Sequence, residues 1–475
     1  MVRLSGIKTR LALNKWECKW FSIIRVKSRR QFLRLLVCFL SQREQTQVSV
    51  REIAKVTFAS SLGTALENFD FFIAGLAAGL VWPTVFFSGL STGAALALSL
   101  VAFALTSIVR PVGAFLFGHF GDRMGRRTTL VWTLMCMGIG TFLIAILPGN
   151  AVIGVWAAIL LSIFRIIQGL GMGGELGSAV SIVSEFAAKS KYRSVWNSIV
   201  MSTTPIGLMM GGVAFSGVAA AMSKTDFVIW GWRLIFVAGA VTAVVGLALR
   251  YKISESPLFL KVRERKELVK APAVEVLKRQ WFVILLMAVI GAQGHAWGSI
   301  VQRPLSLSYL EAVGVGASFA SYAIALSAGL GIFVCILGGY LGDVIGRRWT
   351  MRIGIAIPAI LAYPAFFMMG TRNLALIMLA QVMFYSPTYI CYGNYASCFS
   401  EQFETKYRNS GAGLSYQLGT FINAMVTVAI IAPVLNAFPG PLQSYPYILG
   451  IAEVVAVIAF ISTFLIKETK GAELT

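Results

Sequence analysis

The chain has 475 residues, of which 57% are hydrophobic and only 13% are charged, whereas about a quarter of the residues in a soluble domain are charged. A soluble fold could not bury so much apolar surface, so this composition excludes a soluble enzyme and a disordered chain. The net charge is +21, but the basic residues fall between apolar blocks. We therefore expect the chain to lie in a lipid bilayer and not on nucleic acid.

Metal, disulfide and nucleotide sites are not expected. The six cysteines are scattered without a Cys-x-x-Cys pair, and only two histidines, His119 and His295, are present, so the pattern favours neither zinc nor a disulfide framework. The chain has no Gly-Lys dipeptide, which a Walker A loop requires. We expect no enzymatic activity, no cofactor, no metal and no use of ATP.

Twelve apolar segments are long enough to cross a bilayer, since a spanning helix needs about 20 mostly apolar residues. Backbone groups in hydrocarbon must be satisfied within their own segment, so the segments are predicted to be helices. The segments are 56–82, 93–116, 128–147, 153–184, 195–221, 232–250, 280–302, 316–338, 350–369, 373–398, 410–436 and 445–466. The sequence thus predicts an all-α membrane protein with twelve transmembrane helices.

The basic residues predict the orientation. Most Lys and Arg lie in residues 1–55, in the even-numbered connections and in the tail 467–475, and the positive-inside rule places both termini in the cytoplasm. Residues 1–55 form a basic arm that either lies on anionic lipid or is a leader without a role. The charged connection 251–279 is predicted to be a cytoplasmic linker with a short surface helix, dividing the chain into bundles of six helices at 56–250 and 280–466.

An internal repeat supports this division. The motif Gly-x-x-Gly-Asp-x-x-Gly-Arg-Arg occurs at 118–127 and again at 339–348, and a looser pair, Ser-Glu followed by Lys-Tyr-Arg, occurs at 184–193 and 400–408. Matching connections in two halves indicate a parallel repeat, and hence two pseudo-symmetric bundles. The motif residues are Gly118, Gly121, Asp122, Gly125, Arg126 and Arg127 in the first copy, and Gly342, Asp343, Gly346, Arg347 and Arg348 in the second.

The motif is expected to be more than a topology signal. Glycines allow a tight turn and a close approach of helices, Asp122 and Asp343 could each cap the helix that follows, and the arginines could pair with carboxylates or lipid phosphate. Topology alone requires bases, but not Gly and Asp at a fixed spacing. The looser pair supplies candidate inner-gate charges, with a purely topological role as the alternative: Glu185, Arg193, Glu401 and Arg408.

At these motifs the sequence resembles the major facilitator superfamily, and more closely its metabolite:proton symporters. The resemblance also rests on Glu67-Asn-Phe-Asp70, Arg110-Pro-Val-Gly113, Arg165 through Gly177, and Glu255-Ser-Pro-Leu-Phe259. It implies a twelve-helix transporter that alternates access and is usually driven by protons. The family usually has two aromatic residues between this Glu and Asp and often a tyrosine where Ala74 stands. Asn68 and Ala74 depart from that pattern, so the substrate does not carry over.

Ionisable side chains at membrane depth are candidates for function, because each costs at least about 2.5–3.5 kcal/mol. Glu67 and Asp70 lie on one face of the first segment, and their repulsion should raise the proton affinity of at least one. They are the candidate proton-coupling residues, and an ion pair with Arg165 that only braces the bundle is the alternative.

Arg165 is the first candidate for binding an anionic substrate, because a guanidinium can grip a carboxylate with two bonds. Gln168 lies on the same side of that segment, whereas Glu175 lies off that face and favours helix packing. Arg110 is expected to have a structural or gating role near the motif. In the second half, His295 could relay a proton near neutral pH, and Tyr385, Tyr389 and Tyr392 form a stripe at i, i+4, i+7 spacing that could line a cavity. The candidate substrate-binding residues of this half are polar or aromatic, and helix packing is their alternative: Gln293, His295, Tyr385, Tyr389 and Gln417.

The sequence therefore predicts a secondary active transporter of the inner or plasma membrane. We expect proton symport of a small organic metabolite, an anion if Arg165 binds it, with substrate, proton and lipid as the partners. An exporter or drug:proton antiporter of the same superfamily is one alternative. A non-transporting sensor with this fold is another.

Overall fold

The computed structural model describes residues 49–90, 92–251, 255–264, 271–295, 306–315, 317–426, 429–430, 434, 441–472 and 474. Most of the predicted basic arm, residues 1–48, lies outside the described residues. The helices belong to one compact unit, Val50–Thr475. Every regular element in its described part is helical, and nine of the described helices are long and apolar enough to cross a membrane.

The first half contains the first six predicted segments. Its long helices are α3 (Val50–Leu80), α5 (Thr92–Met124), α6 (Arg126–Ile146), α8 (Trp156–Phe186), α9 (Arg193–Met201) continued by α10 (Thr203–Ala220), and α12 (Trp232–Arg250). Short elements lie at the connections: α4 (Trp82–Val85), α7 (Asn150–Ile153), α11 (Lys224–Asp226) and the π-helical turn η2 (Phe227–Gly231).

The second half repeats this order. Its helices are α14 (Pro272–His295), α16 (Ala317–Ile345), α17 (Arg347–Gly370), α18 (Leu374–Tyr385) continued by α19 (Thr388–Glu401), α20 (Arg408–Val426) and α22 (Pro441–Leu465), with α13 (Pro257–Glu264), α15 (Ser306–Val313) and the 3-10 turn η4 (Thr405–Tyr407) between them. The predicted segment 280–302 begins at a kink, because Gln280 has non-helical backbone angles inside α14. Residues 296–302 of that segment lie outside the described part.

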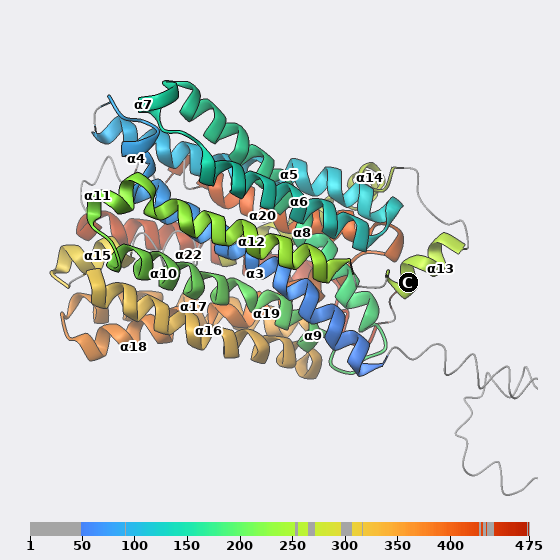
Figure 1. Ribbon diagram of the computed structural model, residues 1–475. Coiled ribbons are helices and arrows are strands. Elements are labelled where there is room, and N and C mark those ends of the chain that lie inside the picture. Colours follow the sequence, from blue (N-terminus) through green and yellow to red (C-terminus); the bar gives the residue numbers. More distant parts are fainter. Residues whose placement is uncertain are drawn as a thin grey trace, which may run out of the picture. The chain divides into compact units, whose positions relative to one another are not determined.

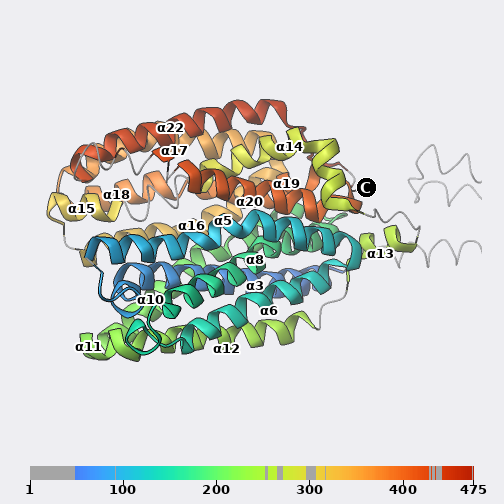
Figure 2. The same ribbon diagram turned by 90° about the horizontal axis from the view of Figure 1, so that it is seen from above.

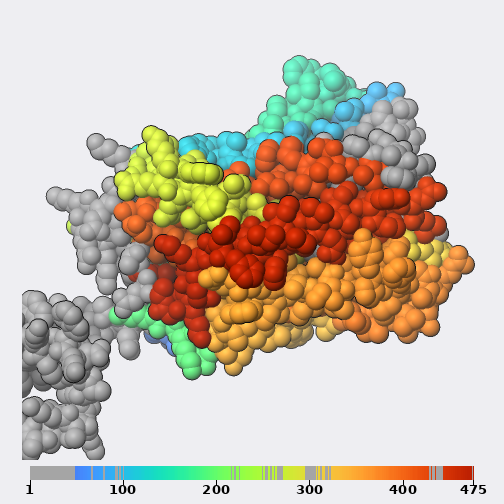
Figure 3. Space-filling view, turned by 180° about the vertical axis from the view of Figure 1, so that it is seen from behind, coloured from blue at the N-terminus to red at the C-terminus, as the bar shows by residue number. Residues whose placement is uncertain are grey.

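The two halves lie side by side with their helices running in the same general direction (Figure 1). In Figure 2 most of the blue to green first half lies below the yellow to red second half, and the two halves are in contact, for example where α5 packs against α20. Each half packs around its own aromatic core, with Trp82 and Trp232 in the first and Tyr385 and Tyr445 in the second. On the opposite side, which Figure 3 shows, the second half forms most of the surface.

Large apolar side chains cover the outer surface. Phe333, Ile360, Phe367 and Val213 are each more than two-thirds exposed. Apolar exposure on this scale is unusual for a soluble monomer and is expected where lipid replaces water.

The repeated motif is helix for most of its length, so α5 and α16 continue beyond the ends predicted for the segments 93–116 and 316–338. Gly118, Gly121 and Asp122 lie in the last turns of α5, and only Gly125 interrupts the helix, with φ +117°. Gly346 makes the same break between α16 and α17, with φ +101°. A single glycine suffices to end one helix and begin the next, because glycine adopts a positive φ without strain.

We refer to the end of the unit where α6 and α17 begin, at Arg126 and Arg347, as the basic end. The C-terminus and the start of α3 lie at this end as well (Figure 1).

Candidate functional site

A buried acid–base cluster lies inside the first half. The Thr141 hydroxyl donates to Asp70 Oδ1 at 2.7 Å, and Gln168 Nε2 donates to Asp70 Oδ2 at 2.8 Å. Arg165 Nη1 donates to Gln168 Oε1 at 2.7 Å and lies 3.9 Å from Asp70 Oδ2. Asp70 is 4% exposed, and Arg165 and Gln168 are fully buried. Three of the predicted site residues are therefore in contact.

The rest of the Arg165 environment also belongs to the first half. The guanidinium carbon lies 5.3 Å from the ring centre of Phe103 and 5.8 Å from that of Trp82, and aromatic faces attract such cations. Arg165 is thus enclosed by a carboxylate, an amide and two rings. Before it could bind a substrate, its contact with Asp70 would have to loosen.

Two predicted site side chains, those of Glu67 and His295, lie outside the described part of the structure. Arg110 is described and is 6% exposed. Its guanidinium lies 5.0 Å from the ring centre of Phe71, and its Nη2 lies 3.5 Å from the sulfur of Met172.

A second buried ion pair joins Glu175 and Arg250, and the sequence pattern predicts only the first of these residues. Arg250 contacts both carboxylate oxygens of Glu175, Thr133 donates to Glu175 at 2.8 Å, and Arg250 also donates to the Leu130 carbonyl at 2.6 Å. All these contacts stay within the first half, which agrees with the packing role favoured for Glu175. Arg250 ends its apolar segment, and from the sequence alone it resembles a topology charge.

The predicted tyrosine stripe of the second half divides in two. The Tyr385 hydroxyl contacts Ser306 and lies in the aromatic core of its own half, so for Tyr385 the structure favours helix packing over cavity lining. Tyr389 packs against α16 at Gly331. It is Tyr392 that reaches the other half, with its hydroxyl 3.1 Å from Thr204 and 2.6 Å from the Tyr416 hydroxyl.

Two predicted amides are fully buried. Gln417 Nε2 donates across the halves to the Met172 carbonyl at 3.2 Å, and Gln293 Oε1 accepts from the Tyr395 hydroxyl at 3.3 Å. Gln417 Oε1 and Gln293 Nε2 have no hydrogen-bond partner among the described residues.

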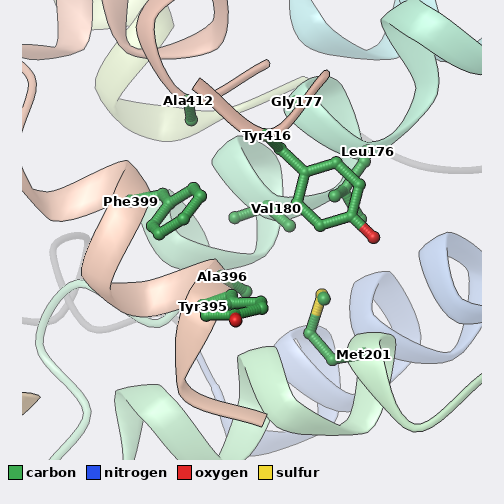
Figure 4. Close-up of a pocket in the computed structure, with 9 residues that line it drawn as sticks. All are labelled: Leu176, Gly177, Val180, Met201, Tyr395, Ala396, Phe399, Ala412 and Tyr416. Carbon is green, nitrogen blue, oxygen red and sulfur yellow. The ribbon is translucent and has the colours of Figure 1, made fainter. Parts of the chain in front are cut away.

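A small void of about 10 Å³ lies where the halves face each other (Figure 4). Residues of both halves line it, and nearly all of the lining is apolar: Leu176, Gly177, Val180, Met201, Tyr395, Ala396, Phe399, Ala412 and Tyr416. Figure 4 shows Tyr416 and Met201 reaching toward it from opposite sides. The halves therefore pack closely here and leave a small gap between them.

The motif aspartates cap helices of the opposite half, and the expectation that each caps the helix following it is wrong. Asp122 accepts from the backbone N–H groups of Asn409 and Ser410 at 3.2 and 2.9 Å, at the start of α20. Asp343 accepts from Ser194 and Val195 at 3.1 Å each, at the start of α9. Each aspartate stands in the last turn of its own helix and can reach the neighbouring half, where the N-terminal dipole favours its charge.

Reciprocal ion pairs join the halves beside these caps. Arg193 of the first half donates to Glu401 of the second at 2.7 Å, and Arg408 of the second donates to Glu185 of the first at 3.1 Å. Within its own half, Arg126 lies 3.3 Å from Glu185, and Arg347 lies 2.9 Å from Glu401. The structure therefore brings the predicted gate charges together in two equivalent clusters.

The caps of α6 and α17 come from acidic residues after the last helix of each half. Glu255 accepts from the Arg126 N–H at 3.0 Å, and Glu468 accepts from the Arg347 N–H at 2.9 Å. The second arginine of each motif copy bonds to the end of the last helix of its half. Arg127 donates to the Tyr251 carbonyl at 2.5 Å, just after α12, and Arg348 donates to the Phe464 carbonyl at 2.8 Å, in the last turn of α22.

Glu468 is a site residue that the sequence reasoning does not include. The sequence pattern that could have identified it is an acidic residue followed by a hydroxyl residue after the last helix of each half: Glu255-Ser256 and Glu468-Thr469. Burial raises the pKa of Glu468, but backbone N–H donors from Arg347, Lys470, Arg348 and Thr469 outweigh burial and hold the pKa below its usual value. Glu468 is therefore charged at neutral pH.

Replacing Gly177 with alanine should part the halves at the basic end. An added Cβ would lie 2.9 Å from Gly413 Cα in α20, and overpacking of this kind costs about 1–3 kcal/mol, so we expect roughly tenfold faster opening. The readout is maleimide labelling of Cys335, which is fully buried with its sulfur 3.6 Å from the Ser198 carbonyl of the other half. The other cysteines are replaced by serine in these variants.

The matched control is Gly212→Ala in α10, where an added Cβ meets nothing within 4 Å. Labelling should be unchanged in this control. Unchanged labelling in Gly177→Ala would show that this contact does not hold the halves together.

Comparison with known proteins gives one family and consistent relatives. Residues 69–427 match the family model of the major facilitator superfamily. The chain is 35% identical to the inner membrane metabolite transport protein YhjE of Escherichia coli over 82% of this chain and 89% of that protein. It is 28% identical to the shikimate transporter of the same organism, over 90% of this chain and 98% of that protein.

Among solved structures, the proton:xylose symporter XylE bound to 6-bromo-6-deoxy-D-glucose superposes with a TM-score of 0.71. The sequence identity is 20%, and the match covers 89% of this chain and 98% of XylE.

Proposed function

Because the chain belongs to the major facilitator superfamily, we propose that it carries a small organic anion across the membrane together with a proton, by alternating access. The chain is a metabolite-type transporter of the inner membrane with twelve transmembrane helices in two bundles, and it is not an enzyme.

The contact between Asp70 and Arg165 carries the proposal. A carboxylate buried at membrane depth costs free energy unless it is paired or protonated, and here it is held by Arg165, Gln168 and Thr141. A proton on Asp70 removes the charge that retains Arg165. The guanidinium then needs another anion, and a substrate carboxylate can supply it with charge-assisted bonds.

The contacts between the halves at the basic end support the alternating-access step. The conformation described is closed at this end, which the positive-inside rule predicts to face the cytoplasm. The Asp122 and Asp343 caps and the reciprocal Arg193 and Arg408 pairs would break when the halves rock apart. Proton and substrate can drive this change only through their different affinities for the two conformations.

The test is uptake by purified protein in proteoliposomes, screened over organic acids, sugars and betaines. We expect an acid exterior to drive accumulation of an organic anion and a proton ionophore to abolish it. Accumulation driven by an acid interior would indicate an antiporter. Binding without uptake or counterflow would indicate a sensor, and either outcome would overturn the proposal.

A further inference from the structure

Arg352 is a buried guanidinium for which the described part of the chain supplies no carboxylate. It lies in the second turn of α17 and is 8% exposed. Its Nε donates to the Thr463 hydroxyl of α22 at 3.2 Å, and no described residue forms an ion pair with it. An unpaired charge among membrane helices is costly, so we looked for a counter-ion outside the chain.

The internal repeat shows how the two halves differ at this place. Glu175 and Arg250 neutralise each other inside the first half. When the halves are aligned on their repeated motifs and on the glutamates after their last helices, Cys391 occupies the position of Glu175. Thr463 occupies that of Arg250, so the second half has neither member of the buried pair. An arginine lies instead on α17, where the first half has a valine, Val131.

The groups next to Arg352 add positive charge. Arg348 lies one turn earlier on α17 and donates to the backbone carbonyls of Thr463 and Phe464. These carbonyls are at the end of α22, and a helix end supplies only about half a negative charge. Two guanidinium charges therefore face half a charge of the opposite sign.

The C-terminal tail does not correct this balance. Its carboxylate, Glu468, accepts from the backbone N–H groups of Arg347 and Arg348 at the start of α17. Lys467 and Lys470 beside it are exposed and carry more positive charge than Glu468 offsets. The region as a whole is left with net positive charge.

Two aromatic rings on the outer surface frame the guanidinium of Arg352. Its carbon lies 3.8 Å from the ring centre of Phe464 and 4.8 Å from that of Trp349, and both rings belong to side chains that are more than half exposed. The helix that carries Phe464, α22, forms a large part of the face shown in Figure 3. The terminal nitrogens of Arg352 have no partner among the described residues, yet they are not among the nitrogens that the fold encloses. An anion can therefore reach them.

The position of Arg352 along α17 fits the lipid headgroup layer. Arg352 follows the first residue of α17, Arg347, by five residues, or about 7–8 Å. The headgroup layer of one leaflet is about 5–7 Å thick, and tryptophan side chains such as Trp349 are enriched at that depth. A phosphate of the surrounding lipid is thus within reach of the guanidinium.

We propose that Arg352, with Trp349 and Phe464, binds the phosphate of an anionic phospholipid at the basic end. A guanidinium can hold two phosphate oxygens at once, and a headgroup with net negative charge neutralises the arginines where a zwitterionic one does not. Inorganic phosphate has the same binding chemistry, but it lacks the acyl chains that the exposed rings would contact. The site depends neither on the coupling ion nor on the substrate.

The test is native mass spectrometry of the purified full-length chain at rising concentrations of one ligand. The probes are phosphatidylglycerol, phosphatidylcholine and inorganic phosphate. We expect phosphatidylglycerol to bind about tenfold more tightly than phosphatidylcholine, the worth of one charge-assisted hydrogen bond, and inorganic phosphate not to bind. Arg352→Met should remove this preference. Arg352→Lys should keep only part of it, because an ammonium group cannot hold two oxygens in the same way.

The matched control is Arg279→Met. It removes the same charge from a surface arginine that Glu275 already neutralises, so the preference should be unchanged. The thermal unfolding midpoint of Arg352→Met before lipid is added should not fall, because the variant removes an unpaired charge. A preference that survives Arg352→Met, or that Arg279→Met removes equally, would overturn the proposal. Binding of inorganic phosphate as tight as that of phosphatidylglycerol would overturn the assignment to lipid.

Discussion

Asp70→Asn is expected to abolish accumulation of substrate against its gradient while counterflow continues. Asparagine keeps the size of the side chain and can still accept from Thr141, which now bonds Asp70 at 2.7 Å. It carries no charge, so Arg165 loses its counter-ion permanently and the site behaves as if always protonated. Proton-driven uptake should fall by about 100-fold or more, as when a positioned proton-transfer group is removed.

The measurement compares pH-driven uptake with counterflow in the same proteoliposomes. Glu453→Gln is the control, because Glu453 is also a carboxyl within a membrane helix but packs in the second half on α22. It should retain both activities. If Asp70→Asn still concentrates substrate with the normal pH dependence, Asp70 does not carry the coupling proton.

Arg250→Met should produce the largest loss of stability. The variant leaves Glu175 charged, fully buried and without its guanidinium partner, and breaking a buried ion pair in this way costs about 3–5 kcal/mol. The double variant Arg250→Met with Glu175→Gln should recover most of that loss, because it removes both charges. The midpoint of thermal unfolding in detergent measures both effects.

The matched control is Arg279→Met. Arg279 forms its ion pair with Glu275 at the surface, where its side chain is 66% exposed, and such pairs contribute at most about 1 kcal/mol. A double variant as unstable as Arg250→Met would show that Arg250 acts through packing rather than through its charge.

The helices and the two-half organisation could be predicted because each follows from a local pattern. Apolar segment length predicts a spanning helix, and the repeated motif relates the halves through Gly125 and Gly346. The continuation of α5 through Gly118 and Asp122 could not be predicted in this way, because the motif glycines resemble turn residues. The close approach of helices expected at the motif glycines is found at Gly118, where an added Cβ would lie 2.9 Å from Ser410 Cα.

The partners of the charges are harder to predict, because sequence spacing contains no information about contacts between halves. An interaction of Arg165 with Asp70 is expected because both lie at membrane depth. Asp122 caps α20 because α5 packs against that helix, which begins nearly 300 residues later in the chain. Glu468 caps α17 because the C-terminal tail folds back to the start of that helix. These are properties of the tertiary fold.

The reciprocal arrangement of Arg193 with Glu401 and Arg408 with Glu185 has a consequence for leakage. Both ion pairs are strong only while water is excluded from the interface between the halves. Breaking either pair would admit water to this interface and weaken the other pair. Opening should then be cooperative, with little time spent in a half-parted form through which ions could slip. The proton coupling that we propose depends on that property, because ions that slip through the carrier would dissipate the gradient that drives it.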